Sequence, residues 1–142
     1  MSLLGPDKED FQPPKMWVVY IAGPFSAPTN WEIKKNVRDA EKLSLEVAKL
    51  GLSFICPHKN SEEFFGLITP EYWYDMTMEL LRRSDMVLLF GSWSGSKGAV
   101  AEYTEAKKLG KPIFSSIEAL KRYVDATPAE RFQMMEEAAN AR

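Results

Sequence analysis

The residues best suited to chemistry lie in one stretch, from Gly91 to Glu102. Gly91, Gly95 and Gly98 allow the backbone to bend sharply and to approach a ligand closely. The amides at the start of the helix expected after this loop have no partner within the helix, so they can bind an anion. Glu102 stands about one turn into that helix, where a carboxylate can attack an electron-poor carbon or stabilise a positive centre on a sugar. The alternative for Glu102 is an ordinary solvated position on the helix.

The glycine-rich loop matches neither of the common phosphate-binding motifs. It lacks GxxxxGK[ST], which excludes the P-loop ATPases, and GSWSGSKG is not the dinucleotide pattern GxGxxG. The loop therefore predicts binding of a small anion or polar ligand, against the alternative of a flexible surface turn. Trp93 within it can stack on a base or a ribose, or pack under the loop, and the residue type favours neither.

Other candidate residues have structural alternatives. Asp75 falls within an expected helix, where a solvated face is the usual position. Asp85 directly precedes an apolar run, and we expect it to accept hydrogen bonds from nearby amides rather than to act in catalysis. Tyr20 lies in an apolar run and is a core candidate. His58 lies in an expected loop with no identifiable catalytic partner.

The elements that must position these residues alternate along the chain. Apolar runs predict strands at 17–22, 52–56, 86–90 and 113–115. Amphipathic periodicity predicts helices at 30–50, 70–83, 118–124 and 128–141, and another from the glycine-rich loop to residue 109. Thr29 with Glu32, and Thr127 with Glu130, have the spacing of a capping box. We expect a loop at 57–69, with a short helical turn at 62–65.

This alternation predicts an α/β fold, a flavodoxin-like or Rossmann-like open parallel sheet of four or five strands flanked by helices. Parallel sheets of this kind bind ligands at the carboxyl ends of their strands. The loops at those ends are 23–30, 57–60, 91–98 and 115–117, and we expect them to meet at one edge. Residues 1–15 should form a flexible tail, 16–125 the domain, and 126–142 a C-terminal helix packed on the domain or on a partner subunit.

Composition excludes several classes of protein. A net charge of -2 does not support binding to a nucleic acid polymer. One cysteine, Cys56, and one histidine are too few for a disulfide framework or a structural zinc site, and we expect neither metal nor cofactor. No apolar run approaches the ~20 residues of a membrane span. The N-terminus lacks a basic region followed by an apolar one, so we expect no signal peptide. We expect a cytoplasmic protein with no membrane partner and with Cys56 as a buried, reduced thiol.

Three segments together resemble a known family. YIAGPF at 20–25, SDMVLLF at 84–90 and SGSKGAVAEYTEAKKLGKPIF at 94–114 are similar to the nucleoside 2-deoxyribosyltransferase-like superfamily, which includes the 2'-deoxynucleoside 5'-phosphate N-hydrolases. The resemblance covers roughly 18–114. It implies a flavodoxin-like sheet, a homodimer or larger homo-oligomer, and cleavage of the N-glycosidic bond of a nucleoside or nucleoside 5'-monophosphate, as hydrolase or deoxyribosyltransferase.

The resemblance also implies roles for particular residues. Glu102 matches the glutamate that attacks the anomeric carbon and forms a covalent glycosyl-enzyme. Ser96 and Gly98 match the residues that hold the 5'-phosphate in the hydrolases. Tyr20 and Gly23 match site residues of the first strand, and His58 falls close to a histidine of the hydrolases. We also assign to substrate binding Pro24 and Phe25 of the same motif and, from its place in the glycine-rich loop, Trp93.

The chain departs from the family pattern at two positions. Thr77 occupies the place of an aspartate that usually assists at the base, and Asp75 or Glu79 can substitute for it; Asp75 is our choice as proton donor. Ser26 replaces a phosphate-binding arginine, and Lys97 can supply a charge instead. The departures keep open a second function, a non-catalytic nucleotide or sugar-phosphate binding protein.

Overall fold

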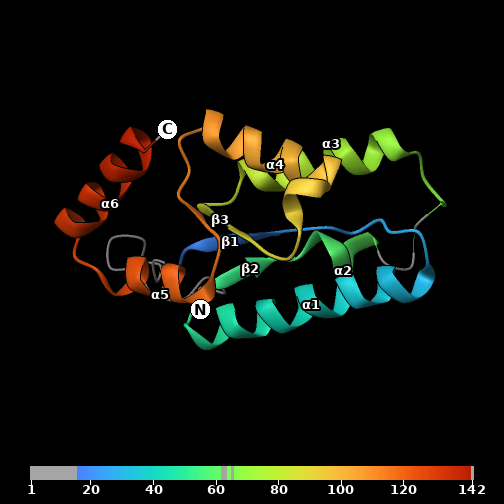
Figure 1. Cartoon of the computed structure of the whole chain (residues 1–142), viewed down its shortest axis with the longest axis horizontal. Helices are drawn as coiled ribbons and strands as arrows, with labels where there is room; N and C mark the ends of the chain where they lie inside the picture. The colour runs from blue at the N-terminus through green and yellow to red at the C-terminus, as the bar shows by residue number, and fades with distance from the viewer. Residues whose placement is uncertain (1–15, 62–63, 65, 142) are drawn as a thin grey trace, which may run out of the picture.

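The computed structural model describes residues 16–61, 64 and 66–141, and its core is a four-stranded parallel sheet (Figure 1). The strands are β1 (Val18–Ala22), β2 (Ser53–Ile55), β3 (Met86–Leu89) and β4 (Ile113–Phe114), in the order β2-β1-β3-β4. The α/β class and the flavodoxin-like parallel sheet are therefore confirmed, with four strands. The predicted N-terminal tail and most of the predicted turn at 62–65 lie outside the described residues.

The strand order places the two most apolar strands in the centre. Tyr20 of β1 pairs with Ile55 of β2 on one side and with Val87 of β3 on the other. The chain builds outward from β1 to β2, then returns to the opposite side of β1 with β3. This change of direction between β1 and β3 is the topological switch point, where sheets of this kind open a crevice at the carboxyl ends of their strands.

The helices follow the predicted order with small shifts at their ends. They are α1 (Asn30–Lys49), α2 (Pro57–Ser61), α3 (Pro70–Arg82), the 3₁₀ turn η1 (Trp93–Gly95), α4 (Lys97–Lys108), α5 (Ile117–Asp125) and α6 (Pro128–Asn140). Both predicted capping boxes, at Thr29 and at Thr127, are present. The prediction of a loop at 57–60 is wrong, because Pro57 begins the short helix α2; proline suits the first position of a helix, where its missing N–H is not needed.

Two helical layers cover the sheet, one on each face (Figure 1). Val19 and Ile21 point from β1 into a core shared with α1 and α5. Tyr20 and Ala22 alternate with them and point into a second core shared with α3 and α4. Tyr20 is therefore directed toward the helix that carries Glu102, and this face of the sheet positions the candidate site.

Two further contacts fix the ends of the domain. The Asp85 carboxylate accepts a hydrogen bond from the Val18 amide at 2.7 Å, which confirms its expected structural role at the start of the central strands. The Arg131 guanidinium of α6 donates to the carbonyl oxygens of Tyr123 and Val124, both at 2.9 Å, and lies 4.6 Å from the centre of the Trp17 ring. Beyond this attachment α6 has no buried residue.

Within the described part of the chain, no helix has both the length and the apolar character that a membrane crossing requires.

Candidate active site

Glu102 lies on the inner face of α4, and its side chain is only 9% exposed. Ser96 caps this helix, since its hydroxyl accepts a hydrogen bond from the Ala99 amide at 3.3 Å. Glu102 follows Ser96 by six residues, which corresponds to about 9 Å along the helix axis. Burial raises the pKa of Glu102 to about 7, against a smaller lowering by the Tyr20 hydroxyl. A carboxylate in this state changes its charge near neutral pH, which is typical of functional sites rather than of surface glutamates.

The Tyr20 hydroxyl lies close to the Glu102 carboxyl. Burial raises the pKa of Tyr20, Glu102 raises it further, and Thr77 lowers it, so the side chains of these three residues lie close together. The hydroxyl is nevertheless without a hydrogen bond of normal geometry to any described residue. A buried hydroxyl without a well-formed hydrogen bond, beside a buried carboxyl, is costly for folding, which favours a role in ligand binding or catalysis over simple packing.

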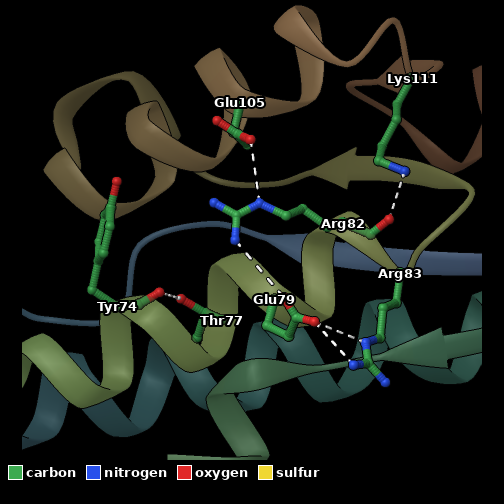
Figure 2. A network of polar contacts seen from close by, with 7 residues as sticks. All are labelled: Tyr74, Thr77, Glu79, Arg82, Arg83, Glu105 and Lys111. Carbon is green, nitrogen blue, oxygen red and sulfur yellow. Dashed lines mark hydrogen bonds and ion pairs between the residues drawn. The ribbon is translucent and has the colours of Figure 1, made fainter.

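Thr77, rather than Asp75, is the residue of α3 that faces this site. Asp75 is exposed and lies two residues away, which is about 200° around the helix axis. Glu79, the other acidic candidate, pairs with Arg83 at 3.0 Å and with Arg82 at 3.8 Å (Figure 2). The structure therefore brings neither acidic residue to Glu102.

Polar contacts on the exposed side of α3 join it to α4 and to Lys111 (Figure 2). Arg82 of α3 donates to Glu105 of α4 at 3.4 Å. Lys111, which follows α4, donates to the carbonyl oxygens of Arg82 and Ser84 at the end of α3. The Thr77 hydroxyl donates to the Tyr74 carbonyl oxygen at 3.0 Å, which restricts its rotation. The first two contacts join α3 to α4 and to the segment after it, and the third lies within α3.

A cavity of about 370 Å³ opens beside the start of α4. Its lining comes from the loop after β1, the first half of α1 and the loop after β3, which meet at the switch point of the sheet. Two of the predicted substrate-binding residues, Pro24 and Ser96, line it together with Ser26. Gly91 begins the second of these loops with φ +61, a conformation that glycine adopts without strain.

Three predicted residues hold the first loop in shape instead of lining the cavity. The His58 ring lies between Phe25 and Phe90, with ring centres 5.6 and 5.3 Å away, and its Nε2–H donates to the Pro24 carbonyl oxygen at 2.9 Å. His58 is 5% exposed, and burial lowers its pKa, so the ring is neutral. Gly23 is required because a Cβ atom there would come within 2.2 Å of the Phe90 ring. These residues support the site by positioning Pro24.

The remaining predicted residues lie around the start of α4. The Trp93 ring packs against Tyr103, 4.8 Å between ring centres, and joins the core on the α3 and α4 face, which favours packing under the loop over stacking on a base. Lys97 and Gly98 are exposed, and Lys97 is not part of the cavity lining. A Cβ atom on Gly98 would meet nothing within 4 Å, so the surface above it is open.

Sequence reasoning missed the contribution of α1 to the cavity. Glu32, Lys35 and Asn36 line it, and Ser92 joins them from the loop after β3. The available signal was the spacing i, i+3, i+4 of the three α1 residues, which places them on one face of the helix. Among the described residues, no group of three or more His, Cys, Asp or Glu could hold a metal ion.

The fold of this chain can be compared with the folds of solved protein structures. The structure of the 2-deoxyribosyltransferase from the psychrotolerant bacterium Bacillus psychrosaccharolyticus matches 80% of this chain and 94% of its own length, with a TM-score of 0.58 and 15% sequence identity. At this identity the likeness establishes the shared α/β fold.

The sequence family is assigned independently of that structure. Residues 17–115 match the family described as Domain of unknown function (DUF4406), and the chain belongs to that family. No curated protein matches the chain in sequence.

Proposed function

We propose that this protein cleaves the N-glycosidic bond of a nucleoside or nucleoside 5'-monophosphate, with Glu102 as the nucleophile. The observation that carries the proposal is the buried Glu102 carboxyl, with a pKa raised to about 7, on a helix that begins at the cavity. The buried Tyr20 hydroxyl beside it and the fold shared with a 2-deoxyribosyltransferase support the proposal.

The chemistry requires two steps at the anomeric carbon of the sugar. In the first, a carboxylate oxygen of Glu102 bonds to that carbon while the bond to the base breaks and its electron pair leaves with the base, which takes up a proton. The transition state resembles an oxocarbenium ion and is stabilised by the nearby negative charge. In the second step, water releases the free sugar, or a second base takes the sugar in a transfer reaction.

A second candidate function is nucleotide or sugar-phosphate binding without catalysis. Thr77 favours it, because the residue of α3 that faces Glu102 and Tyr20 is not an acid. With Asp75 on the exposed face of α3 and Glu79 paired with Arg83, neither of these carboxyl groups of the helix is turned toward Glu102 to protonate a leaving base.

Release of free base distinguishes the two functions. The protein is incubated with nucleosides and 5'-monophosphates, ribo and deoxy, with and without an acceptor base, and the base is measured by chromatography. We expect release by the wild type and loss of at least about 1,000-fold in Glu102→Gln, since the nucleophile is removed. Glu105→Gln, on the same helix but paired with Arg82, is the matched control and should retain activity.

The possible results of this experiment distinguish the two candidate functions. Release that is equal in Glu102→Gln and wild type rules out Glu102 as the nucleophile. Tight nucleotide binding with no release from any substrate establishes the second candidate function instead.

We also propose that the protein acts as a homodimer or larger homo-oligomer in the cytoplasm. Trp31, Leu67 and Phe132 are 80%, 75% and 67% exposed, and a second copy of the chain can cover such apolar surface. Cys56 is a buried free thiol, which suits a reducing compartment. Sedimentation at micromolar concentration should give at least twice the mass of one chain, and a monomer contradicts the proposal.

A further inference from the structure

The indole N–H of Trp73, in α3, is a buried hydrogen-bond donor without a partner. Its Nε1 atom is shielded from solvent and makes no hydrogen bond to any of the described residues. An indole nitrogen donates but does not accept, and a buried one is normally paired. Leaving such a donor unpaired costs free energy of folding. A bound molecule that carries an acceptor atom can satisfy it.

Trp73 lies on the face of α3 that is turned toward the candidate active site. The Thr77 side chain is on that face, beside the Tyr20 hydroxyl, whose pKa it lowers. Trp73 precedes Thr77 by four residues, which places the two on one side of the helix, about 6 Å apart along its axis. This step leads toward the carboxyl ends of the strands, because α3 runs back from that edge to the start of β3. Trp73 therefore lies between Thr77 and the edge where sheets of this kind bind ligands.

The Trp73 side chain does not serve to fill the core. Further along the same helix, Leu80 and Leu81 join the hydrophobic cluster between the sheet and the layer of α3 and α4. Among the described residues, neither of the two core clusters includes Trp73. Its half-buried ring meets that of the exposed Tyr72, with 5.2 Å between ring centres. A large aromatic side chain outside the core, with its N–H unpaired, is more readily explained by contact with a ligand than by packing.

Cleavage at Glu102 requires a group that stabilises the negative charge developing on the leaving base. The carboxyl groups of Asp75 and Glu79 are turned away from the site, and the Thr77 hydroxyl is engaged with a backbone carbonyl oxygen within α3. A hydrogen bond from an N–H group stabilises such a charge, although indole does not transfer its proton. Trp73 can therefore assist departure of the base where no acid is present.

We propose that Trp73 recognises the leaving base, with its Nε1–H donating a hydrogen bond to a ring nitrogen or a carbonyl oxygen of that base. The inference rests on the proposed function for the reaction. As the bond between the anomeric carbon and the base nitrogen breaks, the electron pair leaves with the base and its charge spreads onto the hydrogen-bonded atom. Water then supplies the proton. The preferred substrates are therefore those whose bases are most stable as anions.

Substrates with different leaving bases test this contact. Base release by the whole chain is measured for a pyrimidine and a purine set of nucleosides and 5'-monophosphates, in which fluorine, hydrogen or methyl on the ring changes the acidity of the base. We expect Trp73→Phe, which keeps an aromatic ring and loses the N–H, to lose at least about tenfold in kcat/KM, and most with the least acidic base.

Two further variants separate the N–H from the ring. Benzothienylalanine at position 73 keeps the size of the indole and lacks the N–H, so it should lose as much as Trp73→Phe does. Trp31→Phe, at a position that is 80% exposed, is the matched control and should behave as the wild type. A loss that is equal for every base shows a structural role and overturns the inference, as does a Trp73→Phe variant that matches Trp31→Phe.

Binding separates this inference from the proposed function. Calorimetry measures the affinity of the whole chain for the same substrates. If no base is released but Trp73→Phe binds at least about tenfold more weakly than Trp31→Phe, the contact with the base holds and the proposed function fails. If release depends on Glu102 but not on Trp73, the proposed function holds and this inference fails. A wild type that neither binds nor cleaves any of the substrates overturns both.

Discussion

Glu102 destabilises the folded protein above pH 5, because burial opposes its ionisation. An ordinary glutamate ionises with a pKa of 4.5, whereas Glu102 has a pKa of about 7. Between these values the folded state retains a proton that the unfolded state has lost, so the free energy of unfolding falls as pH rises through this range. Such a cost is typical of sites where function and stability conflict.

Glu102→Gln should therefore raise the free energy of unfolding. The expected gain is about 3 kcal/mol at pH 8, where the wild-type carboxyl is ionised in both states, and about 1 kcal/mol at pH 5. Urea unfolding at the two pH values measures it, with Glu105→Gln as the control. An equal gain at both pH values contradicts the assigned cause.

Tyr20→Phe tests how the site adjusts its nucleophile. The Tyr20 hydroxyl lowers the pKa of Glu102 against the larger effect of burial, so its removal should raise that pKa above the wild-type value of about 7. Since the nucleophile must be ionised, the rise of kcat/KM with pH should shift to higher pH in the variant. An unchanged profile for base release shows that Tyr20 does not act on Glu102.

The turn after β1 is the element on which the shape of the cavity most depends. Gly23 packs against Phe90 from the end of β3, and His58 of α2 holds the next residue, Pro24, through its carbonyl oxygen. Three segments distant in sequence are thus joined at the switch point of the sheet.

Gly23→Ala should destabilise the protein by about 1–3 kcal/mol, because its Cβ atom forces the Phe90 ring to move. The cost should be smaller in a Phe90→Leu background, where the ring is absent, and a double-mutant cycle by urea unfolding measures the difference. Gly95→Ala is the control, since a Cβ atom there meets nothing within 4 Å. Equal costs in the two backgrounds show that Phe90 is not the constraint.

At the scale of the whole molecule, α6 is attached to the domain rather than built into it (Figure 1). Its described residues include none that is buried, and Arg131 makes its contacts with α5 and Trp17. The predicted division of the chain into a tail at 1–15, a domain at 16–125 and a C-terminal helix at 126–142, packed on the domain or on a partner subunit, stays a prediction.

Removal of residues 128–142 should therefore cost about 2 kcal/mol or less and leave the fold and the release of base intact. Arg131→Ala in the full chain should reproduce most of that loss. Thermal unfolding and chromatography of the released base measure these effects in both variants. A truncated chain that fails to fold, or that no longer releases base, shows that α6 is part of the core or of the site.

Much of this protein follows from its sequence, because the signals are local. The strand and helix order, both capping boxes and the parallel sheet depend on periodicity and on residues a few positions apart. The sequence also predicts that Glu102 lies on a helix that begins at a ligand-binding loop, because this prediction depends only on residues close to Glu102 in the chain.

The tertiary structure alone decided which side chains meet. Packing of α3 on α4 turned Thr77 toward Tyr20 and Glu102 and left Asp75 exposed, because residues two apart on a helix face different directions. Packing of α2 buried His58 beneath the turn after β1, whereas the sequence predicts a loop position for it. The strand order β2-β1-β3-β4 brought Lys35 to the cavity beside Ser96, although 61 positions separate them in the sequence. Such contacts depend on the packing of whole elements, and no local pattern in the sequence encodes them.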